Sequence, residues 1–288
     1  MGELASGHTD ISRTMKFFPI RKDDPRTLSK EQIDHFNERG YISPVDVFTN
    51  EEIGDHRAYF DDLMEKALAM GHDSYGINAW HLRIRGIYDL VVEPRILDCV
   101  QDLLGENLIC WGTHYFCKMA GDTKRVSWHQ DASYWPLSPT KVVTVWLAID
   151  DADEANGAMK FIPGSHLHGH ISFEASAKEE ENVLDQTVAS AESYGDDPVL
   201  VPLRAGQMEL HSDLLLHSSE PNPSERRRCG LTMRFAPPDV KALSGGRWGV
   251  QKGWNRLSVI ARGNDPTGHW LDNPRPTADD IPPKGWAP

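Results

Sequence analysis

Between residues 107 and 235 the sequence falls into short segments in which apolar and polar residues alternate, and this pattern limits the possible folds more than any other feature. Alternation with a period of two is typical of strands, and Gly, Pro, Asp and Asn at the segment ends are typical of turns. Short strands at this spacing predict an antiparallel barrel or a double-sheet jelly roll. The predicted strands cover residues 108–118, 126–130, 141–149, 158–162, 198–203, 206–210 and 229–235.

The residues before this region carry helix signals instead. Ser29 with Gln32 and Thr49 with Glu52 form capping boxes, and Pro94 suits the first turn of a third helix. We therefore expect the first hundred residues to be mainly helical and the fold to be mainly β with flanking helices. The apolar face predicted for the second helix consists of Ile53, Phe60, Leu63, Met64, Ala67 and Leu68.

The 288 residues are enough to bury about three quarters of the surface of the unfolded chain, so one elaborated domain or two small ones are expected. We favour a single domain with a mainly helical part over 27–105, a jelly-roll core over 106–240 and a C-terminal extension over 241–288. Residues 1–26 are polar and contain two prolines, which predicts a loosely held arm. The acidic segment 170–197 lacks periodicity and is interpreted as a lid or a mobile insertion.

Charge and cysteine content exclude several functions. A net charge of −13 opposes binding to nucleic acid or to anionic lipid, both of which need clustered Lys and Arg. The four cysteines lack zinc or C-x-x-C spacing and are expected to be reduced. No apolar run has the length of a signal peptide core or a membrane span, so we expect a cytoplasmic protein without a membrane partner.

One group of residues has the spacing of a metal site. His129 lies on the predicted strand 126–130 and Asp131 directly follows that strand, and in extended chain the side chains at i and i+2 leave the same face. His217 follows an apolar run and is the expected third ligand. Two imidazoles and one carboxylate on one face of an ion leave three positions open, as in non-haem Fe(II) oxygenases, for a bidentate 2-oxo acid and O₂.

A second H-x-D pair, His211 and Asp213, competes with this assignment. After His217 the next histidine is His269, in the Pro-rich tail, with no arginine about eleven residues beyond it. We therefore interpret His211 and Asp213 as structural. By contrast, Arg228 follows His217 at that spacing, and a planar guanidinium can bind the distal carboxylate of 2-oxoglutarate through two parallel hydrogen bonds.

Seven motifs together resemble the phytanoyl-CoA dioxygenase family. The likeness covers roughly residues 28 to 240 and implies a double-stranded β-helix of cupin-like jelly-roll type, with Fe(II), 2-oxoglutarate and O₂. The motifs are Trp-His-Gln-Asp at 128–131, Val-Trp at 145–146, Asn-Gly-Ala at 156–158, Ile-Pro-Gly-Ser-His at 162–166, Ala-Gly-Gln at 205–207, His-Ser-Ser at 217–219 and Arg228.

The resemblance also implies roles for single residues. His129, Asp131 and His217 match the family's metal ligands, and Arg228 matches the arginine that binds 2-oxoglutarate. Other positions that touch 2-oxoglutarate in relatives are matched by Trp146, Ser219 and His114.

Several motifs resemble a bacterial subgroup that includes non-haem iron halogenases. Those halogenases carry a small residue where this chain has Asp131. Since the carboxylate fills the position that would take chloride, the expected reaction is hydroxylation.

We therefore expect a dioxygenase that hydroxylates an aliphatic C–H bond and releases succinate and CO₂. Arg234 and Lys118 would give the pocket positive charge, which favours a small anionic metabolite such as 2-aminoethylphosphonate; Tyr134 is a further substrate candidate. Arg83 and Arg85 alternate on a predicted strand, and a solvated surface pair is the favoured interpretation of them over substrate contact.

Three alternatives stay open. The substrate could be an amino acid or another natural-product intermediate tethered to a carrier protein. The same ligands could serve a cupin-type metal protein that does not use 2-oxoglutarate, such as a hydrolase or isomerase. A non-catalytic binding protein on this fold is the third, since a fold does not fix a function.

Overall fold

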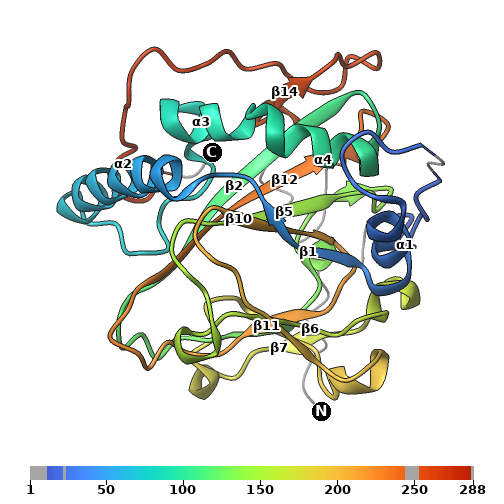
Figure 1. Cartoon of the computed structure of the whole chain (residues 1–288), viewed down its shortest axis with the longest axis horizontal. Coiled ribbons are helices and arrows are strands. Elements are labelled where there is room, and N and C mark those ends of the chain that lie inside the picture. The colour runs from blue at the N-terminus through green and yellow to red at the C-terminus, as the bar shows by residue number, and fades with distance from the viewer. Residues whose placement is uncertain (1–11, 22–23, 244–252, 287–288) are drawn as a thin grey trace.

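The computed structural model describes residues 12–21, 24–243 and 253–286. Four helices and the strand β1 come first along the chain (Figure 1). The helices are α1 (Lys30–Arg39), α2 (Asn50–Ala69), α3 (Arg85–Val91) and α4 (Pro94–Leu104), and β1 (Tyr41–Asp46) lies between α1 and α2.

Both capping boxes form, as the sequence predicts. The Ser29 hydroxyl accepts from Gln32 N, and the Gln32 side chain accepts from Ser29 N; Thr49 and Glu52 repeat the arrangement at α2. The predicted apolar face of α2 is buried except for Leu68, which is 47% exposed.

Two antiparallel sheets make up the core and confirm the jelly-roll prediction. The large sheet has the strand order β1-β10-β5-β12-β2-β14, and the small sheet has the order β3-β11-β6-β9. The strands of these sheets that follow the helices are β2 (Leu108–Lys118), β3 (Val126–His129), β5 (Val143–Ala148), β6 (Met159–Phe161), β9 (Val199–Val201), β10 (Gln207–Ser212), β11 (His217–Ser219), β12 (Arg228–Ala236) and β14 (Val259–Arg262).

Helices α2, α3 and α4 cover the face of the large sheet that points away from the small sheet (Figure 1). Their apolar residues join those of the large sheet in one buried cluster that includes Phe60, Ile96 and Leu231. The two sheets face each other on the opposite side, and that is where the polar residues of the site lie. Packing on one face of the large sheet therefore leaves its other face for chemistry.

Several segments depart from the sequence predictions. Arg83 and Arg85, which were expected to alternate on a strand, instead follow a 3₁₀ turn (Trp80–Leu82) and begin α3, and they bind the carboxylates of Asp280 and Asp279. The described part of the N-terminal arm is held in place, because Arg13 donates to the carbonyls of Ala132 and Trp135.

The acidic segment 170–197 is folded against β3. It contains the short strands β7 (Glu174–Ala175) and β8 (Gln186–Thr187), and Val188 N donates to Trp128 O. A second small pair joins β4 (Leu137–Ser138) to β13 (Lys241–Ala242). All four cysteines are buried and unpaired, as expected. No helix in the described ranges is long and apolar enough to cross a bilayer.

Candidate metal and co-substrate site

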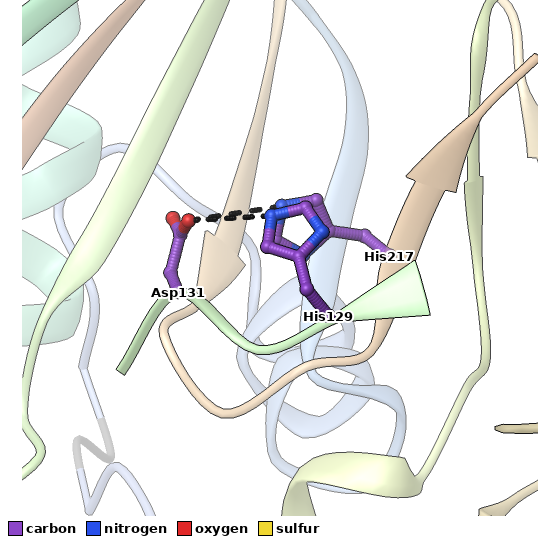
Figure 2. A group of neighbouring side chains, drawn as sticks. All are labelled: His129, Asp131 and His217. Atoms are coloured by element: carbon purple, nitrogen blue, oxygen red, sulfur yellow. Dashed lines mark ion pairs between the residues drawn. The ribbon is translucent and has the colours of Figure 1, made fainter. Parts of the chain in front are cut away.

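The predicted metal ligands meet between the two sheets (Figure 2). His129 ends β3, His217 begins β11, and the two are direct partners in the antiparallel register. Asp131 lies two residues beyond His129 in a 3₁₀ turn (Asp131–Ser133), so the pair does not share the extended geometry assumed from the sequence. One ligand atom of each residue lies within 4.8 Å of the other two.

Both histidines of this triad are oriented by a backbone carbonyl two residues earlier. His129 Nδ1 lies 2.9 Å from Ser127 O, and His217 Nδ1 lies 3.0 Å from Leu215 O. A carbonyl only accepts, so Nδ1 carries the proton in each ring and the lone pair of Nε2 is free. Burial and the neighbouring histidines His129 and His211 hold the pKa of His217 well below its usual value, which keeps this ring neutral.

The two oxygens of Asp131 have different surroundings. Oδ1 lies 3.7 Å from His129 Nε2 and 3.9 Å from His217 Nε2, while Oδ2 accepts a 3.0 Å hydrogen bond from Thr144 Oγ1. Burial alone would raise the pKa of Asp131, but the neighbouring cations His211 and Arg234 hold that pKa well below the usual value. Asp131 is thus an ionised carboxylate with Oδ1 turned toward the two imidazoles.

His211, which sequence reasoning set aside as structural, lies in the same site. Its Nδ1 lies 2.9 Å from Glu209 Oε1, its Nε2 lies 3.7 Å from Asp131 Oδ2, and its ring centroid is 4.7 Å from that of His217. Burial by itself would lower the pKa of His211, but the carboxylates of Glu209 and Asp131 raise it to about 10. His211 therefore places a positive charge next to the triad, on the side of Asp131 Oδ2.

The glutamine of the Trp-His-Gln-Asp motif fixes the loops around the triad. The Gln130 amide nitrogen donates to Gly169 O at 2.8 Å and Leu214 O at 2.6 Å, and its oxygen accepts from Ile171 N at 2.8 Å. Gln130 is 1% exposed. Because the buried amide is fully used in this way, it ties the turn that carries Asp131 to the segment that leads to His217.

A cavity of about 530 Å³ opens beside the triad. Strands β2, β5, β10 and β12 form one wall and the small sheet forms another, with Leu184 of the acidic segment at the side. The C-terminal extension, in which the sequence indicated no role, contributes Trp254, Arg256 and Trp286. This volume suits a small metabolite together with a co-substrate.

Arg228 begins β12 and is 2% exposed. Its Nε and Nη2 have no hydrogen-bond partner among the described residues, and burial lowers the pKa of Arg228 to about 10. A buried guanidinium without a partner is costly unless an anion binds there. The site therefore offers a fork-shaped cation to a carboxylate.

Trp146 supports this guanidinium, whose carbon lies 4.6 Å from the centroid of the indole ring. The indole lies so close to Gly230 that an added Cβ would be 2.0 Å from Trp146 Cζ2, so β12 needs a glycine here. Ser219 and His114 also line the cavity. His114 Nε2 lies 2.7 Å from Tyr75 O, and burial lowers the pKa of His114 to about 4.

Arg234 lies on the same strand as Arg228, six residues on. Its guanidinium carbon is 5.7 Å from the ring of Trp111 and 5.1 Å from that of Trp135, and its Nε has no hydrogen-bond partner among the residues that the structure describes. Tyr134 and Trp135, which follow the triad turn, line the cavity as well. Positive charge therefore occurs at two separate places along the cavity.

Lys118 is the candidate that does not line the cavity. It is 1% exposed, and its ammonium donates to the carbonyls of Lys124, Ser219 and Glu220. Because these acceptors use all three of its protons, the substrate role expected from the sequence has no geometric support. Lys118 instead ties the end of β11 to β2.

Sequence reasoning missed Thr144, Glu209 and the cavity residues of the C-terminal extension. Nothing in the local pattern marks Thr144, which occupies an ordinary strand position. For Glu209 one signal was available, its place between the apolar residues Met208 and Leu210, because charged residues are rarely fully buried without a partner.

The donor set fits Fe(II) and 2-oxoglutarate. Two free imidazole lone pairs and one ionised carboxylate oxygen suit a divalent iron ion, and unpaired nitrogens of Arg228 suit the remote carboxylate of the co-substrate.

Comparisons with known proteins agree with this geometry. The family model of phytanoyl-CoA dioxygenase (PhyH) matches residues 36–230. The chain is 30% identical over 175 residues to a probable alpha-ketoglutarate-dependent hypophosphite dioxygenase of Stutzerimonas stutzeri, an alignment that covers 57% of this chain and 58% of that one. It is 25% identical over 232 residues to phytanoyl-CoA dioxygenase domain-containing protein 1 of Rattus norvegicus, with coverage of 79% and 76%.

A solved structure gives the same result for the fold. The non-heme monooxygenase ThoJ, in its apo form, superposes with a TM-score of 0.72 at 29% identity, over 85% of this chain and 88% of that one. The fold is thus the double-stranded β-helix of non-haem iron and 2-oxoglutarate oxygenases.

Proposed function

The chain belongs to the phytanoyl-CoA dioxygenase family of Fe(II)- and 2-oxoglutarate-dependent dioxygenases, and we propose that it hydroxylates an aliphatic C–H bond of a small anionic metabolite. In this proposal His129, Asp131 and His217 hold the iron, and Arg228 with Trp146, Ser219 and His114 holds 2-oxoglutarate. The bound iron, with 2-oxoglutarate and O₂, supplies the oxidising power: one oxygen atom enters the C–H bond and the other enters succinate as CO₂ leaves.

The proposed substrate class rests on the surroundings of the Arg234 guanidinium. Among the described residues, none forms a hydrogen bond or an ion pair with its guanidinium, although Trp111 and Trp135 flank it. Desolvation at this site lowers the pKa of Arg234, while the nearby Asp131 carboxylate raises it. A cation in such surroundings is stabilised by an anion that arrives with the substrate.

The two arginines divide the cavity between two ligands. Arg228 and Arg234 are six residues apart on β12, so their side chains leave the same face of the strand. Thr144, the β5 partner of Arg234, binds Asp131, which puts Arg234 at the triad end of this face. A 2-oxoglutarate molecule would extend from the iron toward Arg228, and the substrate would occupy the side of Arg234, Tyr134 and Trp254.

A phosphorus oxyanion is the specific substrate class we favour. The Stutzerimonas relative is named for hypophosphite, a small anion of phosphorus. A phosphonate such as 2-aminoethylphosphonate has several acceptor oxygens for a guanidinium and a C–H bond next to phosphorus. Apolar walls from Trp111, Trp135 and Trp254 would hold the carbon part and exclude water.

The test is a screen for substrate-dependent succinate formation with Fe(II), 2-oxoglutarate and O₂. The panel contains 2-aminoethylphosphonate, other alkylphosphonates, carboxylates of the same length and their neutral amides. We expect an anion, a phosphonate foremost, to give the largest stimulation. A neutral amide or a carrier-tethered amino acid as the best substrate would refute the proposed class. Absence of succinate with every compound would favour the cupin-type alternative.

Arg234→Gln then tests the residue itself. With the best anionic substrate its KM should rise about tenfold or more, since a lost charge-assisted hydrogen bond costs about 1.5–3 kcal/mol. The KM for 2-oxoglutarate should stay unchanged. The control is Arg262→Gln, which removes an arginine of β14 that pairs with Asp98 of α4. Equal effects of the two changes would contradict a substrate contact at Arg234.

A further inference from the structure

We propose that Thr144 and the His211–Glu209 pair are positioning residues for the metal ligand Asp131: they hold its Oδ2 so that only Oδ1 faces the iron. This inference rests on the proposed metal role of the triad, but it is independent of the substrate.

The contacts of Asp131 are divided between its two oxygens. Oδ1 is the oxygen near the ligand nitrogens, at 3.7 Å from His129 Nε2 and 3.9 Å from His217 Nε2. Oδ2 receives the hydroxyl of Thr144 at 3.0 Å and has His211 Nε2 at 3.7 Å. One oxygen is thus directed to the metal position, and the other is directed to the large sheet.

Register explains why these two residues act together. Thr144 on β5 and His211 on β10 are direct cross-strand partners, so their side chains leave the large sheet side by side. Glu209 is two residues before His211 and on the same face. The large sheet therefore presents a hydroxyl, an imidazole and a carboxylate together to the turn that carries Asp131.

The hydrogen-bond partners distinguish His211 from the two ligand histidines. All three rings bind an acceptor two residues earlier through Nδ1: the carbonyls of Ser127 and Leu215 for the ligands, and the carboxylate of Glu209 for His211. His211 differs because a carboxylate oxygen lies near each of its nitrogens, Glu209 Oε1 at 2.9 Å from Nδ1 and Asp131 Oδ2 at 3.7 Å from Nε2. Its Nε2 is buried and has no hydrogen-bond partner among the described residues, so Asp131 Oδ2 is the acceptor within its reach.

This arrangement has a consequence for coordination. A bound iron ion with two imidazoles and one carboxylate oxygen would keep three positions open for 2-oxoglutarate and O₂. A carboxylate that bound through both oxygens would occupy one of those three. Holding Oδ2 away from the metal would therefore keep that position open, and donors on Oδ2 would fix the direction of the Oδ1 lone pairs.

Binding of Co(II), followed by calorimetry and by its visible absorption, tests the proposal without turnover. Thr144→Val removes the hydroxyl at constant shape, and Thr144→Ser restores it. His211→Gln and Glu209→Gln remove the other donor and its support. We expect Thr144→Val and His211→Gln to bind Co(II) about 10- to 100-fold more weakly, with an altered absorption band, and Thr144→Ser to remain near the wild-type affinity.

His166→Gln is the matched control, because His166 is also fully buried but binds Asn37 O outside the site. A Co(II) affinity of Thr144→Val within twofold of wild type overturns the proposal, as does such an affinity in His211→Gln. If His211→Gln does not fold, the valine and serine variants of Thr144 decide. His129→Ala distinguishes failure of the metal site from failure of the positioning role. Retained Co(II) binding in this variant would refute the triad, and this proposal with it.

Discussion

Replacement of Arg228 by lysine keeps the charge at the proposed co-substrate site and changes its geometry. The two unpaired nitrogens of the guanidinium, Nε and Nη2, can bind both oxygens of one carboxylate in parallel. Lysine offers a single point charge and cannot lie flat on Trp146 as the guanidinium does at 4.6 Å. Loss of one charge-assisted hydrogen bond costs about 1.5–3 kcal/mol, which corresponds to roughly 10- to 150-fold weaker binding of 2-oxoglutarate.

The measurement is the KM for 2-oxoglutarate from succinate formation, with Fe(II) affinity determined in parallel and expected to survive. Arg227→Lys is the control, since the Arg227 guanidinium binds Asp150 and Asp61 and does not line the cavity. An unchanged KM in Arg228→Lys would remove Arg228 from the co-substrate site. An equal rise in both variants would mean that the effect comes from the strand and not from the carboxylate contact.

Two further predictions concern the metal ligand and acid stability. Asp131→Gly should remove a metal ligand, so succinate release should fall steeply. Added halide should shift the absorption band of the anaerobic Fe(II)-2-oxoglutarate complex, with little chlorinated product. Hydroxylation at the wild-type rate in this variant would refute the ligand role. Burial lowers the pKa of His81 and His166 to about 4, from 6.5 in the unfolded chain, so the unfolded chain binds more protons between these values and stability falls as the pH falls through them. At pH 5 each of these histidines should lower the free energy of unfolding by about 2 kcal/mol. Urea titration at pH 7.5 and pH 5 measures this loss, and His166→Gln should reduce it by about that amount. The same loss in the variant and the wild type would contradict the assignment.

Local pattern was sufficient for most of the fold. β2 occupies the predicted residues 108–118, and α1 and α2 begin at their predicted capping boxes. The strands β1 and β14 were not predicted, because each forms at an edge of the large sheet through pairing with a distant segment, β10 and β2 respectively. Alternation within a segment shows that it can be a strand, but it does not show which partner will complete it.

In the site, too, some residues follow from local pattern and others depend on the pairing of distant strands. The ligand pair His129 and Asp131 and the arginine Arg228 follow from spacing and from the resemblance of their motifs. The residues behind Asp131 follow from register alone: Thr144 and His211 are 67 positions apart and meet because β5 pairs with β10. The sequence therefore indicated which side chains could bind an ion, whereas the side chains that orient them needed the sheet.

In the proposed function, the position of both arginines on β12 separates the contact needed in every turnover from the contact that selects the substrate. Their Cα atoms are about 20 Å apart, at roughly 3.4 Å a residue, with Gly230 and Thr232 between them on the same face. If these roles hold, substitutions at the Arg234 end would alter the charge, size or length of the molecule accepted there, while the carboxylate contact at the Arg228 end would stay intact. New substrates could then be acquired by exchanging a few side chains, without changing the metal ligands.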